Sequence, residues 1–554
     1  MTRPGAHGPH CDQLAPFDVP SSELSMLNLS AHVPSRYTSG QTGSRGLRCL
    51  GIRMVIQRTR QAMQGWVRDA TKPGKLARKR TSSRCFGCLD RGGCCRGQGV
   101  CLHGWCACEH GFYGIDCAHG PGHQHDHTPV RNGLSIFIYE VPPELSFRFG
   151  RHINPNYQSE RRFLDRLLPD GNARTLDPES ADLFLVPFFD TYGPAENRFC
   201  DRARFEMIVH WLRARHPYWD RSGGRDHVFF LNGDRGACGF GTAGLSPIFV
   251  SHFGLLGTFR TMKESAERVV ARKKLELEEN ETKLGRKMTS GAWCYSPHKD
   301  IVAPPYLPAP PVLPSASDRR GRASRLLVHA GGIWGALTDK PGLERPTYYS
   351  MGVRQRLYEI YGTGGSSPVP AICILNSSVG GRSATLKFMQ SSDFCLATCG
   401  DGWGMRWSQS MLAGCLPLIA QPLVVQPLED VLDFDAFSRR VEAHKLEELP
   451  QVLSRDDEVT VRHMHDVQSQ VRAAFSWDPA VGLAYNYTLL ALCQRAMELR
   501  GRLKGGGNCA QIHDGLPGAS LMRRMPSWFP PALRKAVTRS IEARRASFAQ
   551  NYIA

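Results

Sequence analysis

The sequence predicts an α/β fold with two Rossmann-like domains that face one cleft, preceded by a small disulfide-rich module. From residue 134 onward, apolar strand-like runs alternate with helical stretches, which is the pattern of parallel α/β layers. Upstream, eight of the 19 cysteines lie between residues 85 and 117, a density typical of a local disulfide framework in an oxidising compartment. With 554 residues, 41% of them apolar, the chain can bury cores for two or more domains.

Residues 1–84 are expected to form a basic, disordered tail. Between residues 43 and 84 there are twelve Lys/Arg and one acid, a large part of the net charge of +18. Such a tail could be a nucleic-acid arm, an organelle transit segment, the cytosolic flank of a membrane anchor or a solvated segment without a partner. Nucleic acid is not expected as a partner, because no aromatic platform or zinc-finger spacing accompanies the charge. The N-terminal sequence shows neither a signal peptide nor an apolar window long enough to span a membrane.

The cysteine-rich segment, residues 85–118, resembles an EGF-like module. Its end, Cys106 to Cys117, follows the pattern C-x-C-x-x-G-F-Y-G-x-x-C, with glycines where a tight hairpin needs positive φ. A zinc site is the alternative, because Cys85-x-x-Cys88 has ligand spacing. The pairing of the eight cysteines stays open. They are Cys85, Cys88, Cys94, Cys95, Cys101, Cys106, Cys108 and Cys117.

Composition divides the rest of the chain. Residues 119–132 form a His-rich linker, which we interpret as a polar spacer and alternatively as a metal-binding tract. An N-terminal Rossmann-like domain is predicted for 133–302, a proline-rich interdomain linker for 303–324, and a second Rossmann-like domain for 325–500. The tail 501–554 is basic and broken by prolines, and the sequence assigns it no function.

Each domain has its own series of strand-like runs. In the first they are "LSIFIYEV", "ADLFLVPFF", "DHVFFLNG" and "DIVAPP"; in the second they are "RLLVHAGG", "AICILNSS", "FCLATCGDG" and "LPLIA". The charged stretch at 259–284 predicts one exposed helix. Because ligands of open α/β sheets lie beyond the carboxyl ends of the strands, the residues that follow each run are the candidate functional residues.

The most informative candidate segment is 394–420, "FCLATCGDGWGMRWSQSMLAGCLPLIA". A strand leads into Gly402 and Gly404, whose backbone N–H groups can approach a phosphate, and a helix follows whose N-terminus favours anions. Arg406 can neutralise a diphosphate with its permanently charged guanidinium. Gln409 lies one helical turn further along the same face. Asp401 is either a ligand contact or a helix cap.

This segment resembles, position by position, the nucleotide-sugar loop of two-domain glycosyltransferases. Other segments narrow the resemblance to the exostosin family, glycosyltransferase family 47. They are "IFIYEVPPE", "ESADLFLVPFF", "GRDHVFFLNGDRGACGF", "HKDIVAPPY", "YYSMGVRQRLYEIY" and "PLEDVLDFDAFSRRV". They occur in the family's order over about residues 134–441. "LLVHAGG" departs from the family pattern, in which a bulky aromatic followed by F-x-G is more usual.

The resemblance implies a GT-B type enzyme that transfers a sugar from a nucleotide sugar, usually UDP-linked, to a wall or matrix glycan, in most members with inversion. No bound metal or permanent cofactor is implied, so Arg406 with Arg354 or Arg356 would stabilise the departing diphosphate. The two residues on "MGVRQRLY" could instead form salt bridges. At the position of Gln409 the family has an acidic residue that holds the ribose hydroxyls. The amide of Gln409 can still form hydrogen bonds to them, but without the added strength of a charged acceptor. Glu429 is a further donor contact or part of a solvated loop.

Inversion requires a general base for the acceptor hydroxyl. We look for it in the N-terminal domain, which normally holds the acceptor. Asp234 in "LNGDRGACG" follows a strand and ranks first, with a turn or helix cap as the alternative. His227 and Asp190 follow, and His227 could equally be a buried structural histidine. No metal site is predicted.

The resemblance also implies a cellular location and a set of partners. An EGF-like module before such a domain resembles plant and green-algal members, whose luminal enzymes are typically anchored in the Golgi by an N-terminal transmembrane helix. Four N-x-S/T sequons, the first at Asn28, are compatible with this route. The expected partners are a nucleotide sugar, a glycan acceptor and, as in some relatives, a related glycosyltransferase subunit. A non-catalytic adhesion or lectin-like protein that keeps the fold is the alternative.

Three cysteines of the second domain, Cys395, Cys399 and Cys415, are close in sequence. Disulfides or small buried side chains are expected there rather than a catalytic thiol, because glycosyl transfer needs no thiolate.

Overall fold

The computed structural model describes part of the chain. The described residues are 94–102, 105–109, 112, 115–118, 133–141, 145, 155–189, 198–239, 246–277, 279–291, 293–307, 325–333, 349–362, 371–376 and 381–553. The predicted basic tail 1–84, the His-rich linker 119–132, most of the proline-rich linker, Asp190 and the Cys85/Cys88 pair lie outside them.

The first sheet has six strands, and all neighbouring strands are parallel. In spatial order they are β4 (Arg174–Thr175), β3 (Ile136–Ile138), β5 (Leu183–Leu185), β6 (His227–Leu231), β7 (Ile248–Ser251) and β9 (Ile301–Val302). The connecting helices are α6 (Ser159–Leu167), α7 (Arg198–Arg215), α8 (Tyr218–Ser222), α9 (Phe259–Val270) and α10 (Glu281–Thr289). The central strand β6 is buried at all five positions, as expected for a parallel strand covered on both faces.

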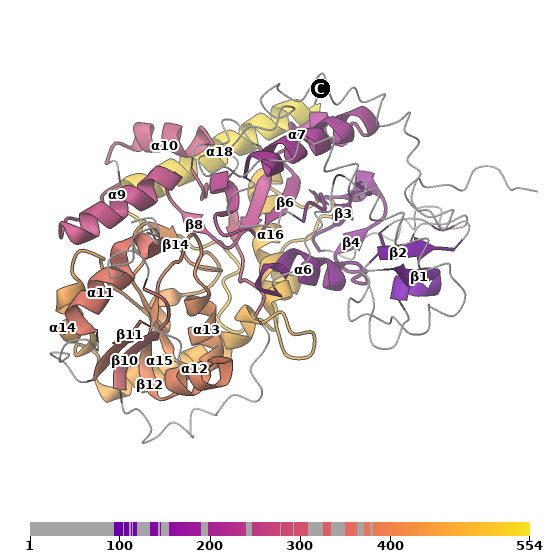
Figure 1. Ribbon diagram of the computed structural model, residues 1–554. Coiled ribbons are helices and arrows are strands. Elements are labelled where there is room, and N and C mark those ends of the chain that lie inside the picture. Colours follow the sequence, from indigo (N-terminus) through magenta and orange to yellow (C-terminus); the bar gives the residue numbers. More distant parts are fainter. Residues whose placement is uncertain are drawn as a thin grey trace, which may run out of the picture.

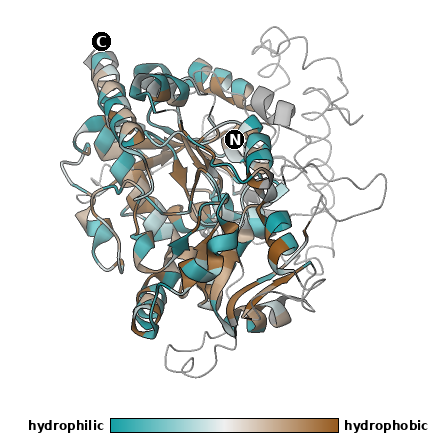
Figure 2. Ribbon diagram, turned by 90° about the vertical axis from the view of Figure 1, so that its left-hand side faces the viewer, coloured by the Kyte–Doolittle hydropathy of each residue, from teal (hydrophilic) through white to brown (hydrophobic). Residues whose placement is uncertain are grey.

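The second sheet has five parallel strands. Their order is β11 (Ile372–Leu375), β10 (Arg325–Ala330), β12 (Ser392–Ala397), β13 (Leu416–Ile419) and β15 (Arg439–Arg440). Its helices are α11 (Val353–Tyr361), α12 (Gly381–Gln390), α13 (Met405–Ala413), α14 (Leu449–Leu453) and α15 (Glu458–Val471). In Figure 1 this sheet and its helices form the lower left lobe. Figure 2 shows the brown, apolar strands inside and teal, polar residues on the outer helices.

The two lobes are joined by backbone pairing. Strand β8 (Gly254–Leu255) follows the first sheet's β7 and pairs antiparallel with β14 (Val424–Val425) of the second lobe. A Cβ atom on Gly254 would overlap with the carbonyl oxygen of Val425, so only glycine permits this approach.

The C-terminal part of the chain returns to the first sheet. It contains α16 (Ala484–Arg500), α17 (Ala510–His513) and α18 (Pro531–Ile553), and Figure 1 shows α18 in yellow beside α10. The guanidinium of Arg500 donates to the backbone of Asp182 and the carboxylate of Asp226, and Arg544 donates to Ser246 O at 2.8 Å. Helix α16, placed by the sequence in the second domain, therefore belongs by these contacts to the first sheet, and the 501–554 tail packs there too.

The end of the cysteine-rich module is attached to the first sheet. Strands β1 (Gly99–Leu102) and β2 (Trp105–Cys108) form an antiparallel hairpin, and Cys117 is disulfide-bonded. The adjacent Asp116 makes a buried two-pronged ion pair with Arg174 of β4, at 2.6 and 3.1 Å. The module is thus held against the edge of the sheet by a desolvated contact. The assignment as EGF-like stays a prediction.

All eight predicted strand segments contain strands, which confirms the mixed α/β prediction with parallel sheets. The single helix expected over 259–284 is wrong. Helix α9 ends at Val270, Arg272 has a positive φ of 54°, and α10 begins at Glu281 after Asn280, whose side chain accepts from the backbone N–H of Lys283. Charge patterning alone did not reveal this cap, because an N-cap inside a charged run resembles a helix interior.

Candidate functional site

The candidate site lies where the carboxyl ends of the two sheets meet. The loop after β6 contains Asp234, and the loop after β12 contains Trp403. The backbone N–H of Trp403 donates to the carbonyl oxygen of Asp234 at 2.8 Å. Beside this contact, Arg235 pairs with the carboxylate of Asp401 at 2.6 Å. The loop predicted to carry a base and the loop predicted to bind a donor are therefore in direct contact.

Two glycines of the second loop are required by close packing. A Cβ atom on Gly402 would overlap with the carbonyl oxygen of Asp234, and one on Gly404 would overlap with that of Thr398. Neither glycine has a positive φ, so contact with neighbouring backbone, and not an unusual conformation, is what selects glycine here. Gly404 directly precedes α13 as its N-cap residue.

Two arginines converge at the carboxyl end of β10. Arg354, on α11, donates to Thr398 Oγ1 at 2.8 Å, to Tyr349 Oη at 3.1 Å and to Gly332 O at 3.3 Å. Arg406, on α13, donates to the carbonyl oxygen of Ala330. Burial and the charge of Arg354 lower the pKa of Arg406 to about 10, so it remains a cation at neutral pH. In the described part of the chain neither guanidinium has an ion-pair partner, so two adjacent positive charges are left uncompensated.

Gln409 lies beside this pair, as its helical spacing predicted. Its Oε1 accepts from Arg406 Nη1 at 2.9 Å. The amide therefore orients the guanidinium without neutralising it, which a carboxylate at the same place would do.

Sequence reasoning missed His329, the penultimate residue of β10. Its side chain is 3% exposed, and neither ring nitrogen bonds to any described residue. Burial and the charges of Arg354 and Arg406 hold the pKa of His329 well below its usual value, so the imidazole is neutral. The departure of "LLVHAGG" from the family pattern was the available signal.

The surroundings of Asp234 affect how readily its carboxyl group ionises. Its Oδ1 accepts from the hydroxyl of Tyr157 at 2.5 Å. Burial and the charge of Asp401 raise its pKa, and the Tyr157 hydrogen bond acts in the opposite direction. The ring of Tyr157 also packs edge-on against Trp403, at a centroid distance of 5.7 Å.

A second polar group on the first sheet was not predicted. Ser159, at the start of α6, bonds to Asn232 after β6 and to His252 after β7, the latter at 2.7 Å. The next residue, Glu160, accepts from the backbone N–H groups of Phe188 and Phe189 at 2.9 and 2.8 Å. Burial lowers the pKa of His252 to about 4, so it is neutral. Polar residues after two consecutive strands, "LNGD" and "SHFG", were the signal for this group.

The structure separates His227 from this junction. It begins β6, at the opposite edge of the sheet, where its ring stacks with Tyr139 and Phe184. Nδ1 bonds to Asp226 at 2.9 Å and the other nitrogen to the Tyr139 hydroxyl at 3.0 Å. This is the structural histidine foreseen as the alternative, so we do not retain His227 as a base. Asp190 lies outside the described residues.

Two of the donor candidates are engaged elsewhere. Arg356 pairs with Glu447 and with Glu359, the latter at 3.0 Å, on the opposite side of α11 from the site. Glu429 is buried and accepts from Arg440 at 2.9 Å and from the indole of Trp528 at 2.8 Å. Their salt-bridge and packing roles account for both.

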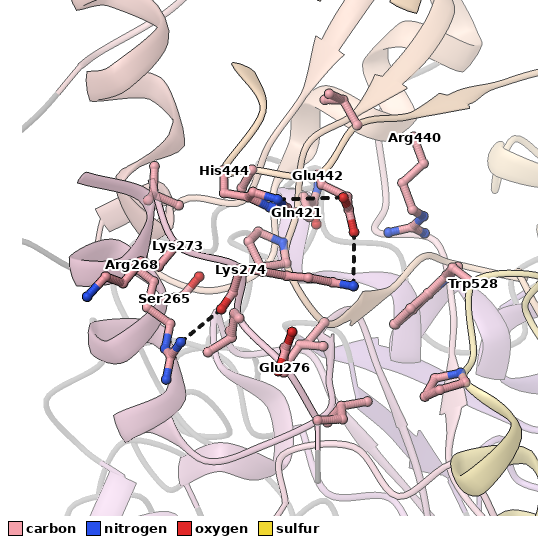
Figure 3. A pocket seen from close by; sticks show the side chains of 18 of the residues that line it. Ser265, Arg268, Lys273, Lys274, Glu276, Gln421, Arg440, Glu442, His444 and Trp528 are labelled. Carbon is pink, nitrogen blue, oxygen red and sulfur yellow. Dashed lines mark hydrogen bonds and ion pairs between the residues drawn. The ribbon is translucent and has the colours of Figure 1, made fainter. Parts of the chain in front are cut away.

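A cavity of about 480 Å³ opens at the carboxyl ends of β13 and β15. It is lined by α9 and the segment after it, by residues 421–423 and 440–444, and by the C-terminal segment 528–532. In Figure 3, Glu442 points inward between Lys274 and His444, and the ring of Trp528 forms the opposite wall beside Arg440. Charged side chains and one aromatic face thus line the cavity.

Most of the described cysteines form disulfides, and Cys373 and Cys399 are free. Disulfides join Cys395 to Cys415 and Cys238 to Cys294, and Cys493 pairs with Cys509. Cys399 is free and buried, and burial raises the pKa of its thiol to about 12. A catalytic thiol is not supported, in agreement with the sequence analysis.

Comparison with known proteins assigns the family. The model of the Exostosin GT47 domain matches residues 130–455. The chain belongs to the exostosin GT47 family, which is a family of glycosyltransferases.

Several curated relatives are similar over the same region. A probable beta-1,4-xylosyltransferase of Arabidopsis thaliana is 24% identical over 54% of this chain and 66% of its own length. A probable glucuronosyltransferase of Oryza sativa subsp. japonica is 24% identical over 58% of this chain and 68% of its own. A probable glucuronoxylan glucuronosyltransferase of Arabidopsis thaliana is 25% identical over 58% and 63%. The match thus spans about two thirds of each relative.

The described residues offer neither a metal site nor a membrane-spanning helix. They contain no group of three His, Cys, Asp or Glu side chains arranged to hold a metal ion. No helix among them is both long and apolar enough to cross a membrane.

Proposed function

We propose that this protein transfers a sugar from a nucleotide sugar to a cell-wall or matrix glycan, and that the donor's diphosphate binds between Arg354 and Arg406. The observation that supports this most strongly is the pair of guanidiniums at the carboxyl end of β10, for which no described residue is an ion-pair partner. Buried charges are normally paired, so two adjacent cations without a described acidic partner favour an anionic ligand. The N-terminus of α13 adds its dipole at the same place.

The proposed arrangement is of GT-B type, with the general base on the first sheet and the donor on the second. Parallel sheets bind ligands at their carboxyl ends, and here these ends meet at the contact of Asp234 with Trp403. The single displacement proceeds with inversion. Asp234 takes the proton of the acceptor hydroxyl while the electron pair of the breaking sugar–oxygen bond passes to the diphosphate, whose charge Arg354 and Arg406 stabilise.

For the glycan acceptor we propose the cavity of Figure 3, which continues the same edge of the second sheet. The guanidinium of Arg440 lies over one face of the Trp528 ring, 4.6 Å from the ring centroid, and the other face can pack on the C–H face of a sugar. Glu442 and Lys274, which form a 3.5 Å ion pair, can bond its hydroxyls. Side chains of both lobes line this cavity, as expected for an enzyme whose two substrates meet between its lobes.

The names of the relatives suggest the substrates. The three described above are named xylosyltransferase, glucuronosyltransferase and glucuronoxylan glucuronosyltransferase. We accordingly propose UDP-xylose or UDP-glucuronate as donor and a xylan-like chain as acceptor. The disulfides support an oxidising compartment, and the Golgi lumen, with membrane association, is the proposed location. The cysteine-rich segment 85–118 is proposed to be an EGF-like module.

The test is a transfer assay with the full chain. UDP-xylose, UDP-glucuronate, UDP-glucose and UDP-galactose are each supplied with xylo-oligosaccharides, and UDP release and product mass are measured. Transfer from one donor that Asp234→Asn abolishes, with UDP affinity retained, supports the proposal. Binding of glycan without turnover of any donor would instead favour the lectin-like alternative.

A further inference from the structure

His329 is placed for contact with the same diphosphate. It directly precedes the segment 330–332, which holds both guanidiniums: Arg406 donates to Ala330 O and Arg354 to Gly332 O. A Cβ atom on Gly331 would lie 2.8 Å from Arg406 Nη2 and 3.5 Å from His329 Nε2. The absent side chain of Gly331 therefore leaves the imidazole and the guanidinium side by side at the end of the strand.

The imidazole has no other described role. Buried polar side chains are almost always hydrogen-bonded, because burying one without a partner destabilises the fold. His329 is 3% exposed and bonds to no described residue. By contrast, His227 and His252 are equally buried and each uses both ring nitrogens. A histidine that serves packing alone would be expected to resemble those two.

The charged groups that face His329 decide its protonation. They are Arg354 from α11 and Arg406 from α13, while its register partner on β11 is Ile374 and the nearby phenol of Tyr349 bonds to Arg354. With two cations and no anion among the described residues that face it, the neutral ring is favoured. An arriving diphosphate reverses the sign of the local field and so favours the imidazolium.

We propose that His329 is a leaving-group residue: its imidazole donates a hydrogen bond to the terminal phosphate of the nucleoside diphosphate held by Arg354 and Arg406, and takes up a proton from solvent when that diphosphate binds. This inference rests on the proposed donor site.

The charges on the donor and on the product indicate at which step of the reaction the proton on His329 is needed. A UDP-sugar carries about two negative charges, which the two guanidiniums balance, and free UDP carries about three when its terminal phosphate is fully ionised. As the sugar–oxygen bond breaks, the electron pair becomes the third charge on the terminal phosphate. The imidazolium of His329 balances it, and its N–H remains directed at the oxygen that left the sugar.

Calorimetry with UDP tests this without turnover. UDP is titrated into the full chain at about pH 7.5, above the second phosphate pKa of about 6, in two buffers of different ionisation enthalpy. The difference in apparent enthalpy gives the protons taken up. His329→Gln and His329→Phe are measured alongside, because ionisation of UDP itself contributes equally to each and cancels. We expect proton uptake in the unmodified chain to exceed that of both variants, with His329→Gln binding UDP within about tenfold.

Three results would overturn the proposal. If proton uptake is equal in the unmodified chain and in folded variants that still bind UDP, His329 does not take up the proton. The proposed donor site would then remain supported. If the unmodified chain does not bind UDP, both the proposed donor site and this inference are contradicted. If neither variant folds, the affinity of the unmodified chain is measured from about pH 8.5 to 7, where it should rise as pH falls; a flat profile contradicts proton uptake.

Discussion

The carbonyl oxygen of Asp234 accepts a hydrogen bond from the backbone N–H of Trp403 at 2.8 Å. This one contact joins the loop after β6 of the first sheet to the loop after β12 of the second. It fixes the position of the Asp234 carboxylate relative to the start of α13, where Arg406 lies. The proposed transfer depends on that position, because displacement requires the base and the leaving-group cations on either side of the sugar.

Gly402→Ala should disrupt this contact. The added Cβ overlaps with the carbonyl oxygen of Asp234, so the two loops must separate. A displacement of about 1 Å can cost about a hundredfold in rate, and we expect a loss of that order in kcat. Gly285→Ala is the matched control. It lies in α10 with nothing within 4 Å of a Cβ, and should keep full activity and gain about 0.5–1 kcal/mol of stability. Equal activity of the two variants would contradict the account.

The pH profile should reveal Asp234. A base works only when ionised, so kcat/KM should fall as pH decreases through its pKa, which burial raises above the usual Asp value. Tyr157→Phe removes the hydroxyl that stabilises the carboxylate. The acid limb of the profile should then move to higher pH, whereas Asp234→Asn should abolish transfer at every pH. If Tyr157→Phe does not move the acid limb, that limb belongs to a group other than Asp234.

Two arginines two residues apart on α11, and therefore on opposite sides of the helix, provide a controlled test of the donor site. Arg354→Ala should weaken UDP binding by about 2 kcal/mol, or roughly 30-fold, because a charge-assisted contact is lost. Arg356 lies on the same helix but pairs with Glu447 and Glu359. Arg356→Ala should leave UDP affinity unchanged and cost at most about 1 kcal/mol of stability, since the pair is partly exposed. The two UDP affinities are compared by calorimetry; similar losses would place the diphosphate elsewhere.

The link between the cysteine-rich module and the sheet can be tested by stability. Asp116→Ala leaves the buried Arg174 without its partner and should cost about 3–5 kcal/mol in denaturant unfolding. Glu179→Ala breaks a similar two-pronged pair with Arg221 that is largely exposed, and should cost at most about 1 kcal/mol. If the module were an independent stalk, the two variants would lose similar amounts.

Much of the fold was predictable because its signals are local. The runs "DHVFFLNG" and "FCLATCGDG" are long, apolar and followed by glycine, so both strands and the loops after them were found. Strand β7 (Ile248–Ser251) is as buried as β6 but was not predicted, since it is short and lies next to a proline-containing loop. The return of α16 to the first sheet was not foreseen, because it depends on contacts such as Arg500 with Asp226, between residues far apart in the chain.

The sequence predicted residues of the candidate site only where a recognisable motif also fixes where each side chain lies on its helix or strand. The spacing of Arg406 and Gln409 places them on one helical face, and the structure brings them into contact. Arg354 and Arg356 cannot be distinguished by spacing, because the partner that occupies Arg356 is Glu447, 91 residues away. For His329 the one signal was the departure of "LLVHAGG" from the family pattern, and it was weak because an apolar strand with one histidine is usual in a core. Its importance appears only when the two guanidiniums are seen beside it.

The most direct test of the central claim is a calorimetric titration of UDP and UDP-sugars into the full chain and its Arg406→Ala variant, with Arg356→Ala as control. The account predicts specific binding that Arg406→Ala weakens by about 2 kcal/mol and Arg356→Ala leaves unchanged. Binding that is equally tight in all three proteins, or no binding of any nucleotide at millimolar concentration, would contradict a donor site between Arg354 and Arg406.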